Sequence, residues 1–297
     1  MKNSNPIIRA IENYRATPEE KLEAWKRLGL DDDVLGAART KPQEAPLIPL
    51  VDTVKQAEKL IAHGDQIVGL STGYKVLDQM TKGIGPSEIV VIFGDTSHGK
   101  SQLAQNISIN VSKHSGPVLF VGLEMSNAEN TARFLNMDDG NTNLPIFYPA
   151  NMDLGYKDID NLVGSAKQAG TVLVVIDHLH MFARDVTNLA NELSLICHEL
   201  KRVARKYELP MLVISHISRS GGGKPPELKD LKGSSSIEQD ADIALAVWRD
   251  MDKDDNVLKV VLRKNRLRGR QHRTAELAIL PNARLAEKLT ISAFPSR

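Results

Sequence analysis

The residues with the most distinctive chemistry form a glycine-rich segment that directly follows an apolar run of strand length. This segment matches the pattern G-x-x-x-x-G-K-[ST] and reads Gly94-Asp95-Thr96-Ser97-His98-Gly99-Lys100-Ser101. Its glycines let the backbone wrap a polyphosphate, and its N–H groups and the start of the following helix face the anion. Lys100 would reach the β- and γ-phosphates, and Ser101 would bind Mg²⁺. The pattern predicts a nucleotide-binding loop; the alternative is a glycine turn with an exposed lysine.

Hydrolysis of a bound nucleoside triphosphate also needs a metal ligand and a group that orients the attacking water. Asp177 closes the apolar run Val172–Ile176, an arrangement in which an acid at a strand end holds the Mg²⁺ shell. Glu124 follows the run Val118–Leu123, which we expect immediately beside the phosphate loop in a parallel sheet. Glu124 is therefore the predicted water-orienting residue. The alternative is a glutamate in the first turn of a helix that is capped by Ser126.

Three histidines follow the same kind of strand-like run. His216 comes after Met211–Ser215, where a polar side chain can sense the γ-phosphate and pass its presence to the next loop; a buried, satisfied histidine is the alternative. His178 and His180 could complete a metal site with Asp177. We do not favour that site, because strand alternation would put His178 on the opposite side from Asp177 and because magnesium prefers oxygen ligands.

Two cationic segments could contact phosphates. The first is the glycine- and proline-rich stretch between His216 and Ser236, which could hold a single nucleic-acid strand and move with nucleotide state. Its basic residues are Arg219, Lys224, Lys229 and Lys232. The second, Arg263–Arg270, carries five cations in eight residues and could be a nucleic-acid patch or offer a charge to a neighbour's γ-phosphate. Either segment could instead be solvated surface structure.

Composition narrows the range of functions. A net charge of +1 over 297 residues excludes a general polyanion binder, so any grip on nucleic acid must be local. Aromatic residues make up 4% of the chain, which disfavours base stacking as the main contact. The single cysteine, Cys197, excludes an intrachain disulfide and a multi-cysteine zinc site, and its apolar helical neighbours predict a core position. We expect a soluble, cytoplasmic protein that does not bind membranes, because no stretch resembles a signal peptide or a membrane span.

The elements that must position these residues are predicted by alternating patterns. Short apolar runs rich in β-branched residues predict buried strands. They are Ile89–Phe93, Val118–Leu123, Val172–Ile176, Met211–Ser215, Ile243–Trp248 and Val257–Leu262. Segments of helical period lie between them, among them Gln102–Val111 and Asn191–Tyr207. This alternation predicts an α/β fold with a mostly parallel sheet flanked by helices and joined by right-handed crossovers.

The first 65 residues differ from the rest, being charged and helical in pattern. Thr17 is the predicted cap of one helix, Lys41–Pro49 is a proline-rich connector, and Asp52–His63 is a second helix. We therefore divide the chain into a small helical N-terminal region with a linker helix, 1–65, and a domain, 66–297. The N-terminal region is too small for its own core, so we expect it to dock on this domain or on a neighbouring subunit.

In their order along the chain, these segments resemble the RecA-fold motor domain of DnaB-type hexameric replicative helicases, including bacteriophage forms. The resemblance extends from Val68 to near Leu289 and rests on a lead-in to the phosphate loop and on four later segments. The lead-in is Ser71–Gly83, and the later segments are Leu123–Ser126, Ile176–Leu179, Val213–Ser220 and Asp230–Asp242. The last of these is the most diagnostic, because it is similar to the family's strand-gripping loop and the helix that follows it.

This resemblance implies a RecA-like ATPase that uses ATP and Mg²⁺, encircles single-stranded DNA as a ring, with a hexamer expected, and displaces the other strand. By position, Lys264 and Arg266 match cations that reach the nucleotide of the adjacent subunit, and Gly233 belongs to the strand-gripping loop. Primase or a helicase loader are implied partners, in the cytoplasm of a bacterium or a phage-infected host cell.

Two features depart from the bacterial pattern. His216 stands where the bacterial proteins usually have glutamine, which is a phage-like feature. Residues 1–65 are too short for the helical collar or the zinc-binding primase domain, so we expect neither, and no primase activity. The alternative function is a RecA-like ATPase that acts as a recombination mediator or assembly switch without unwinding. The Asp230–Asp242 segment together with His216 favours the helicase.

Overall fold

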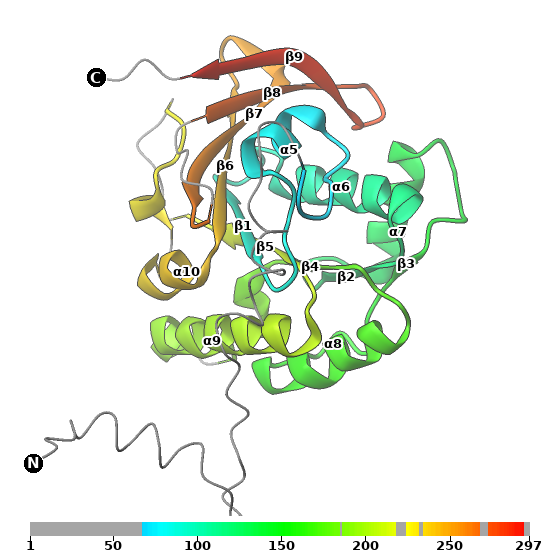
Figure 1. Ribbon diagram of the computed structural model, residues 1–297, viewed down its shortest axis with the longest axis vertical. Helices are drawn as coiled ribbons and strands as arrows, with labels where there is room; N and C mark the ends of the chain where they lie inside the picture. Colours follow the sequence, from blue (N-terminus) through cyan, green and yellow to red (C-terminus); the bar gives the residue numbers. More distant parts are fainter. Residues whose placement is uncertain (1–66, 185, 218–223, 232–233, 268–272, 294–297) are drawn as a thin grey trace, which may run out of the picture. The chain divides into compact units, whose positions relative to one another are not determined.

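The computed structural model describes residues 67–184, 186–217, 224–231, 234–267 and 273–293 (Figure 1). The predicted N-terminal region 1–65, with its Asp52–His63 helix, lies outside the described residues. The boundary between that region and the domain at 66–297 therefore stays a prediction.

The described residues form one nine-stranded sheet in the order β3-β2-β4-β5-β1-β6-β7-β8-β9. Its strands are β1 Ile89–Gly94, β2 Val118–Gly122, β3 Ile146–Phe147, β4 Leu173–Asp177, β5 Met211–His216, β6 Ile243–Asp250, β7 Asp254–Asn265, β8 Arg273–Ile279 and β9 Leu285–Ala293. Neighbours from β3 to β6 are parallel, and those from β6 to β9 are antiparallel. The predicted α/β fold with a mostly parallel sheet is confirmed, although β3, β8 and β9 were not predicted.

Helices cover both faces of this sheet. They are α5 Lys75–Thr81, α6 Lys100–His114, α7 Asn127–Met137, α8 Ile159–Gln168, α9 Leu189–Tyr207 and α10 Ser234–Asp240. Because successive strand residues point to opposite faces, Val90 and Ile92 of β1 pack in one apolar cluster with α6, whereas Val91 and Phe93 pack in another with α8 and α9. Figure 1 shows α8 and α9 on one side of the parallel strands and α6 and α7 on the other.

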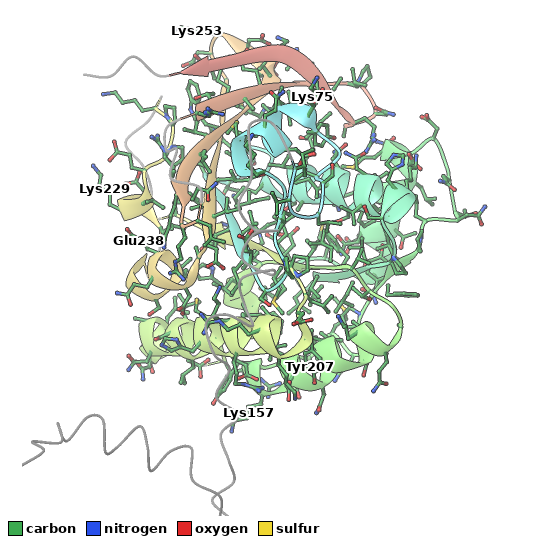
Figure 2. All side chains as sticks on the ribbon, viewed as in Figure 1. Lys75, Lys157, Tyr207, Lys229, Glu238 and Lys253 are labelled. Atoms are coloured by element: carbon green, nitrogen blue, oxygen red, sulfur yellow. The ribbon has the colours of Figure 1, made fainter. Side chains whose placement is uncertain are left out.

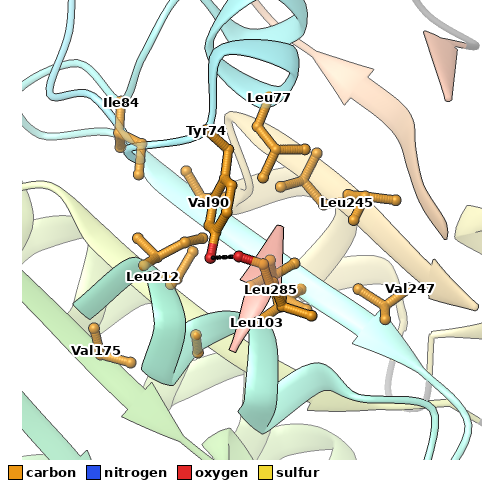
Figure 3. Close-up of a cluster of buried hydrophobic side chains, with 14 of the residues drawn as sticks. Tyr74, Leu77, Ile84, Val90, Leu103, Val175, Leu212, Leu245, Val247 and Leu285 are labelled. Atoms are coloured by element: carbon orange, nitrogen blue, oxygen red, sulfur yellow. Dashed lines mark hydrogen bonds between the residues drawn. The ribbon is translucent and has the colours of Figure 1, made fainter. Parts of the chain in front are cut away.

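The segment before β1 packs against the last antiparallel strands of the sheet. Tyr74, at the start of α5, is 3% exposed, and its hydroxyl lies 3.3 Å from the carbonyl oxygen of Leu285 in β9, to which it donates a hydrogen bond (Figure 3). Asp78 of α5 is also buried and accepts hydrogen bonds from the Ser71 hydroxyl and the Thr72 N–H, while burial raises the pKa of its carboxyl. This lead-in segment thus supports the sheet from which the phosphate loop emerges.

Cys197 lies on the buried face of α9 with 5% of its surface exposed, which confirms its predicted core position. Burial raises the pKa of its thiol to about 12, so the thiolate that reacts with oxidants and metals is scarce at neutral pH. Among the helices of the described ranges, none is long and apolar enough to cross a membrane.

Candidate nucleotide-binding site

The phosphate loop connects the end of β1 to the start of α6, as the pattern predicts. Gly94 ends the strand beside β6, and a Cβ at this position would lie 2.4 Å from the carbonyl oxygen of Val247. Gly99 has a φ of 92°, a left-handed conformation that favours glycine, and a Cβ there would lie 2.8 Å from Leu258 Cδ1. Glycine is therefore required at position 94 by the backbone of the neighbouring strand and favoured at position 99 by the left-handed φ.

A cavity of about 490 Å³ opens over this loop and gathers most of the residues predicted to bind or hydrolyse the nucleotide. Those that line it are Thr96, Ser97, Gly99, Lys100, Ser101, Glu124, Asp177 and His216. The side chain of His98 is directed elsewhere, because its Nδ1 accepts a hydrogen bond from the Arg249 N–H at 3.0 Å. Asp95 is not among the described residues that line the cavity. Its backbone carbonyl oxygen accepts a hydrogen bond from Lys100.

Lys100 is 5% exposed, and its Nζ donates a hydrogen bond of 2.8 Å to the carbonyl oxygen of Asp95. Burial lowers the pKa of its ammonium group, and the negative charges of Asp177, Asp95 and Glu124 oppose this shift. The ammonium group is thus held inside the cavity at the start of α6, where the N–H groups of the helix also face inward. This arrangement suits a polyphosphate.

Asp177 ends β4 and is 5% exposed. Burial raises the pKa of its carboxyl to about 6, and a hydrogen bond from the Ser101 side chain acts in the opposite direction. Among the described residues its buried Oδ1 has no hydrogen-bond partner. A buried carboxylate oxygen that lacks a partner and lies near a serine hydroxyl fits a hard cation such as Mg²⁺, which binds oxygen ligands.

The position of Glu124 corrects one expectation. Its strand, β2, is not beside the phosphate loop, because β4 and β5 lie between β2 and β1. The Glu124 side chain nevertheless lines the cavity, since parallel strands bring their carboxyl ends to one edge of the sheet. The glutamate precedes α7 rather than lying in its first turn, while Ser126 caps that helix through a capping box with Glu129.

His178 corrects a second expectation, that it lies on the opposite side from Asp177. Strand β4 ends at Asp177, so the alternation of side chains does not extend to the next residue. His178 lines the same cavity, and its Nε2 lies 2.8 Å from Glu124 Oε2 and 3.5 Å from Asp177 Oδ1. Burial lowers the pKa of its imidazole to about 3, assisted by nearby His216 and Lys100. The predicted set of site residues missed this histidine.

The ring of His178 stacks on that of His216, with centroids 3.9 Å apart and planes 13° apart. His216 ends β5 directly opposite Gly94 of β1, so the sheet register sets it beside the phosphate loop. One carboxylate oxygen of Glu124 and one nitrogen from each of the two rings lie within 4.8 Å of one another.

Two arginines of the cavity were also missed by the sequence analysis. Arg249 comes from β6, and its Nε donates a 2.8 Å hydrogen bond to the carbonyl oxygen of Asp255; Arg133 comes from α7. A second cavity of about 480 Å³ adjoins the first and shares Arg133 and Gln102 with it. No spacing pattern in the sequence distinguishes these arginines from surface cations. Only the tertiary structure brings β6 and α7 to the cavity.

The predicted trans-acting cations lie elsewhere. Lys264 and Arg266, at the end of β7, are not among the described residues that line the cavity. Lys264 donates hydrogen bonds to the carbonyl oxygens of Glu238 and Gln239 at the end of α10. Arg266 donates to the Gln239 carbonyl oxygen, and its Nη1 lies 3.2 Å from Asp242 Oδ1. Both cations are therefore held beside α10.

The predicted strand-binding loop is described in part. Arg219, Lys232 and Gly233 lie outside the described residues. Lys224 is exposed, and Lys229 is 77% exposed with its Nζ 2.8 Å from Glu227 Oε2. Arg263 of β7 fixes this segment by donating hydrogen bonds to the carbonyl oxygens of Pro226 and Pro225, at 2.8 and 3.2 Å. Arg263 therefore has a structural role here.

The chain is similar to known proteins. The family model for the DnaB-like helicase C terminal domain matches residues 69–143 and 139–283. The replicative DNA helicase DnaB of Geobacillus stearothermophilus is 31% identical over an alignment of 255 residues that covers 73% of this chain and 56% of that protein. A probable replicative DNA helicase of Trieres chinensis is 31% identical over an alignment of 242 residues that covers 67% of this chain and 53% of that protein. The chain thus spans about half the length of these relatives.

Solved structures show the same fold. One of them, the structure of an ATPase domain, superposes with a TM-score of 0.72 at 24% identity and covers 80% of this chain and 98% of that chain. A DnaB-like replicative helicase, described together with its interactions with primase, gives a TM-score of 0.69 at 24% identity over 85% of this chain and 70% of that chain. The RadB recombinase gives 0.55 at 21% identity over 74% of this chain and 99% of that chain.

Proposed function

On the premise that the chain belongs to the DnaB-like helicase C terminal domain family, an ATP-dependent DNA helicase family, we propose that it hydrolyses ATP to move along single-stranded DNA and unwind duplex DNA. The observation that supports this is the convergence on one cavity of Lys100 from the start of α6, Glu124 from the segment after β2, and Asp177 and His216 from the ends of β4 and β5. Phosphoryl transfer to water needs a cation, a metal ligand, a water-orienting group and a γ-phosphate contact, and each has a candidate here.

In this proposal the loop N–H groups and Lys100 bind the phosphates, and the adjoining cavity accepts the sugar and base. Ser101 and Asp177 would hold Mg²⁺, which when bound neutralises developing charge on the phosphates. Glu124 orients the attacking water and accepts its proton. His216, at the end of β5, contacts the γ-phosphate and reports its presence to the loop that follows.

We propose that a neighbouring subunit completes the site. Arg266, with Lys264, would extend from the β7 end of one protomer to the γ-phosphate bound by the next, in a ring that we expect to be a hexamer. Neither residue lines the cavity of its own protomer, which supports this role, because an arginine finger can be supplied in trans. Primase or a helicase loader are the partners that we propose, and a bacterial or phage-infected cytoplasm is the setting.

A forked-duplex unwinding assay with ATP, run beside a mass measurement at the same protein concentration, tests this function. We expect strand separation by a multi-subunit species. ATP hydrolysis and assembly without strand separation would instead indicate a recombination mediator or assembly switch. A monomer that hydrolyses ATP equally fast with and without single-stranded DNA would contradict the proposal.

The salt dependence of DNA binding tests the proposed strand-binding loop. Removing Lys224 and Lys229 together should weaken single-strand binding and flatten the plot of log affinity against log salt, because the slope changes by about 0.7 for each phosphate that a cation neutralises. Lys253→Ala is the matched control, since this lysine is 83% exposed and also has a carboxylate partner, Asp250. Figure 2 shows Lys253 and Lys229 on well-separated parts of the surface. An unchanged slope in the double variant would remove the loop from the DNA path.

A further inference from the structure

The proposed steps do not use His178, a buried residue that lines the cavity. His178 is 4% exposed and lies between Glu124, which its Nε2 approaches to 2.8 Å, and His216, on whose ring it stacks. We propose that His178 is a positioning residue that holds the water-orienting carboxylate of Glu124 and couples it to His216. This inference rests on the proposed function and adds a residue to it.

The hydrogen-bonding capacity of the two groups fixes the direction of the contact. A carboxylate oxygen only accepts, so the proton must be on Nε2 of His178. Its Nδ1 is buried and has no hydrogen-bond partner within the described part of the chain, so a proton there would be an unsatisfied buried donor. At 3.5 Å the Asp177 oxygen is at the limit of hydrogen-bonding distance. The geometry therefore assigns the Nε2–H tautomer, with Glu124 as acceptor.

Glu124 has need of such support. Its side chain is 55% exposed, whereas that of His178 is 5% exposed and packed within the site. A half-exposed glutamate samples several rotamers, and a group that orients water must be held to within about 0.5 Å of its productive position. A buried imidazole that donates to one carboxylate oxygen restricts this freedom and leaves the second oxygen for a water molecule.

The ring stack gives the same histidine a second contact. His216 ends β5, and the next residue, Ile217, forms an antiparallel bridge with Leu231. The segment between these two residues contains Lys224 and Lys229 of the proposed strand-binding loop. A displacement of His216 by that loop would therefore be transmitted to His178 by ring contact and to Glu124 by the hydrogen bond.

Three variants separate the two contacts. His178→Phe keeps a ring for stacking and removes the N–H donor, His178→Gln keeps a side-chain N–H and removes the ring, and His178→Ala removes both. Met181→Ala is the control, because Met181 is 47% exposed and lies in the turn Leu179–Phe182 that directly follows His178. The measured quantities are kcat and KM for ATP, with and without saturating single-stranded DNA.

Without DNA, the alanine and phenylalanine variants should lose kcat by roughly tenfold to a hundredfold, because the carboxylate is no longer held in place. We expect KM for ATP to change by less than about threefold, and glutamine to recover most of the kcat that alanine loses. The stimulation of hydrolysis by DNA should persist in the phenylalanine variant and fall in the glutamine variant. Wild-type kcat in His178→Phe, or wild-type stimulation in His178→Gln, would overturn the proposal.

The tautomer provides a readout that does not depend on activity. In the full chain labelled with ¹⁵N-histidine, two-bond ¹H–¹⁵N correlations should show the Nε2–H form for His178, assigned by its loss in His178→Phe. Glu124→Ala should convert it to a mixture of tautomers. An Nδ1–H form in the wild-type chain would overturn the pairing. A wild-type chain that hydrolyses no ATP would contradict the proposed function, while the tautomer would still decide whether His178 and Glu124 are paired.

Discussion

Arg266→Ala should reduce DNA-stimulated ATP hydrolysis by about 10³-fold or more while ATP binding is retained, since a cation supplied to the transition state has effects of this size. The variant should fold, because Asp242 keeps two other partners: the N–H of Ile89, at 2.8 Å from its Oδ2, and the ammonium group of Lys201. Turnover by rapid quench and binding of a fluorescent ATP analogue measure the two effects separately.

Mixing two inactive variants tests whether the cation acts between subunits. In a ring made of Arg266→Ala and Glu124→Ala chains, some interfaces combine an intact Arg266 from one subunit with an intact Glu124 from the next. Hydrolysis should partly return at those interfaces. Lys259→Ala is the control, because it also removes a cation from β7. This lysine lies over the Trp248 ring and near Glu276 on the same sheet. If the mixture stays as inactive as its components, Arg266 does not act in trans.

Lys100→Ala should abolish hydrolysis and weaken ATP binding by at least about a hundredfold, because it removes the buried cation that the phosphates would contact. The substitution also removes the hydrogen bond to the Asp95 carbonyl oxygen, worth about 1.5–3 kcal/mol for a charged donor, but it relieves the cost of burying the ammonium group as well. We therefore expect the free energy of unfolding to change little. Isothermal titration with ATP and urea denaturation measure the two quantities.

The matched control for this prediction is Lys113→Ala. Lys113 lies on the same helix, α6, but at its other end, where it pairs with Asp138 on the surface. That variant should bind and hydrolyse ATP like the wild-type chain. Unchanged ATP affinity in Lys100→Ala would mean that the glycine-rich loop is not the phosphate site.

Local sequence determined those parts of this protein whose conformation depends on residues close to them in the sequence. The run before Gly94 is apolar at every position, as a strand covered on both faces requires, and it forms β1. Lys100 and Ser101 begin α6 because the left-handed Gly99 precedes them. The acid after Val172–Ile176 ends β4 and reaches the cavity. Motif spacing therefore predicted the fold class and most of the candidate site.

The tertiary structure alone decided which strand ends are neighbours. Strand order depends on long crossover connections, which leave no local pattern, so β4 and β5 separate β2 from β1 against expectation. For the same reason Arg133 and Arg249 reach the cavity without a spacing signature, and Gly94 is required by the Val247 carbonyl oxygen of another strand. His178 was misplaced because strand periodicity stops where β4 stops, and only packing brings its imidazole between a carboxylate and a second ring.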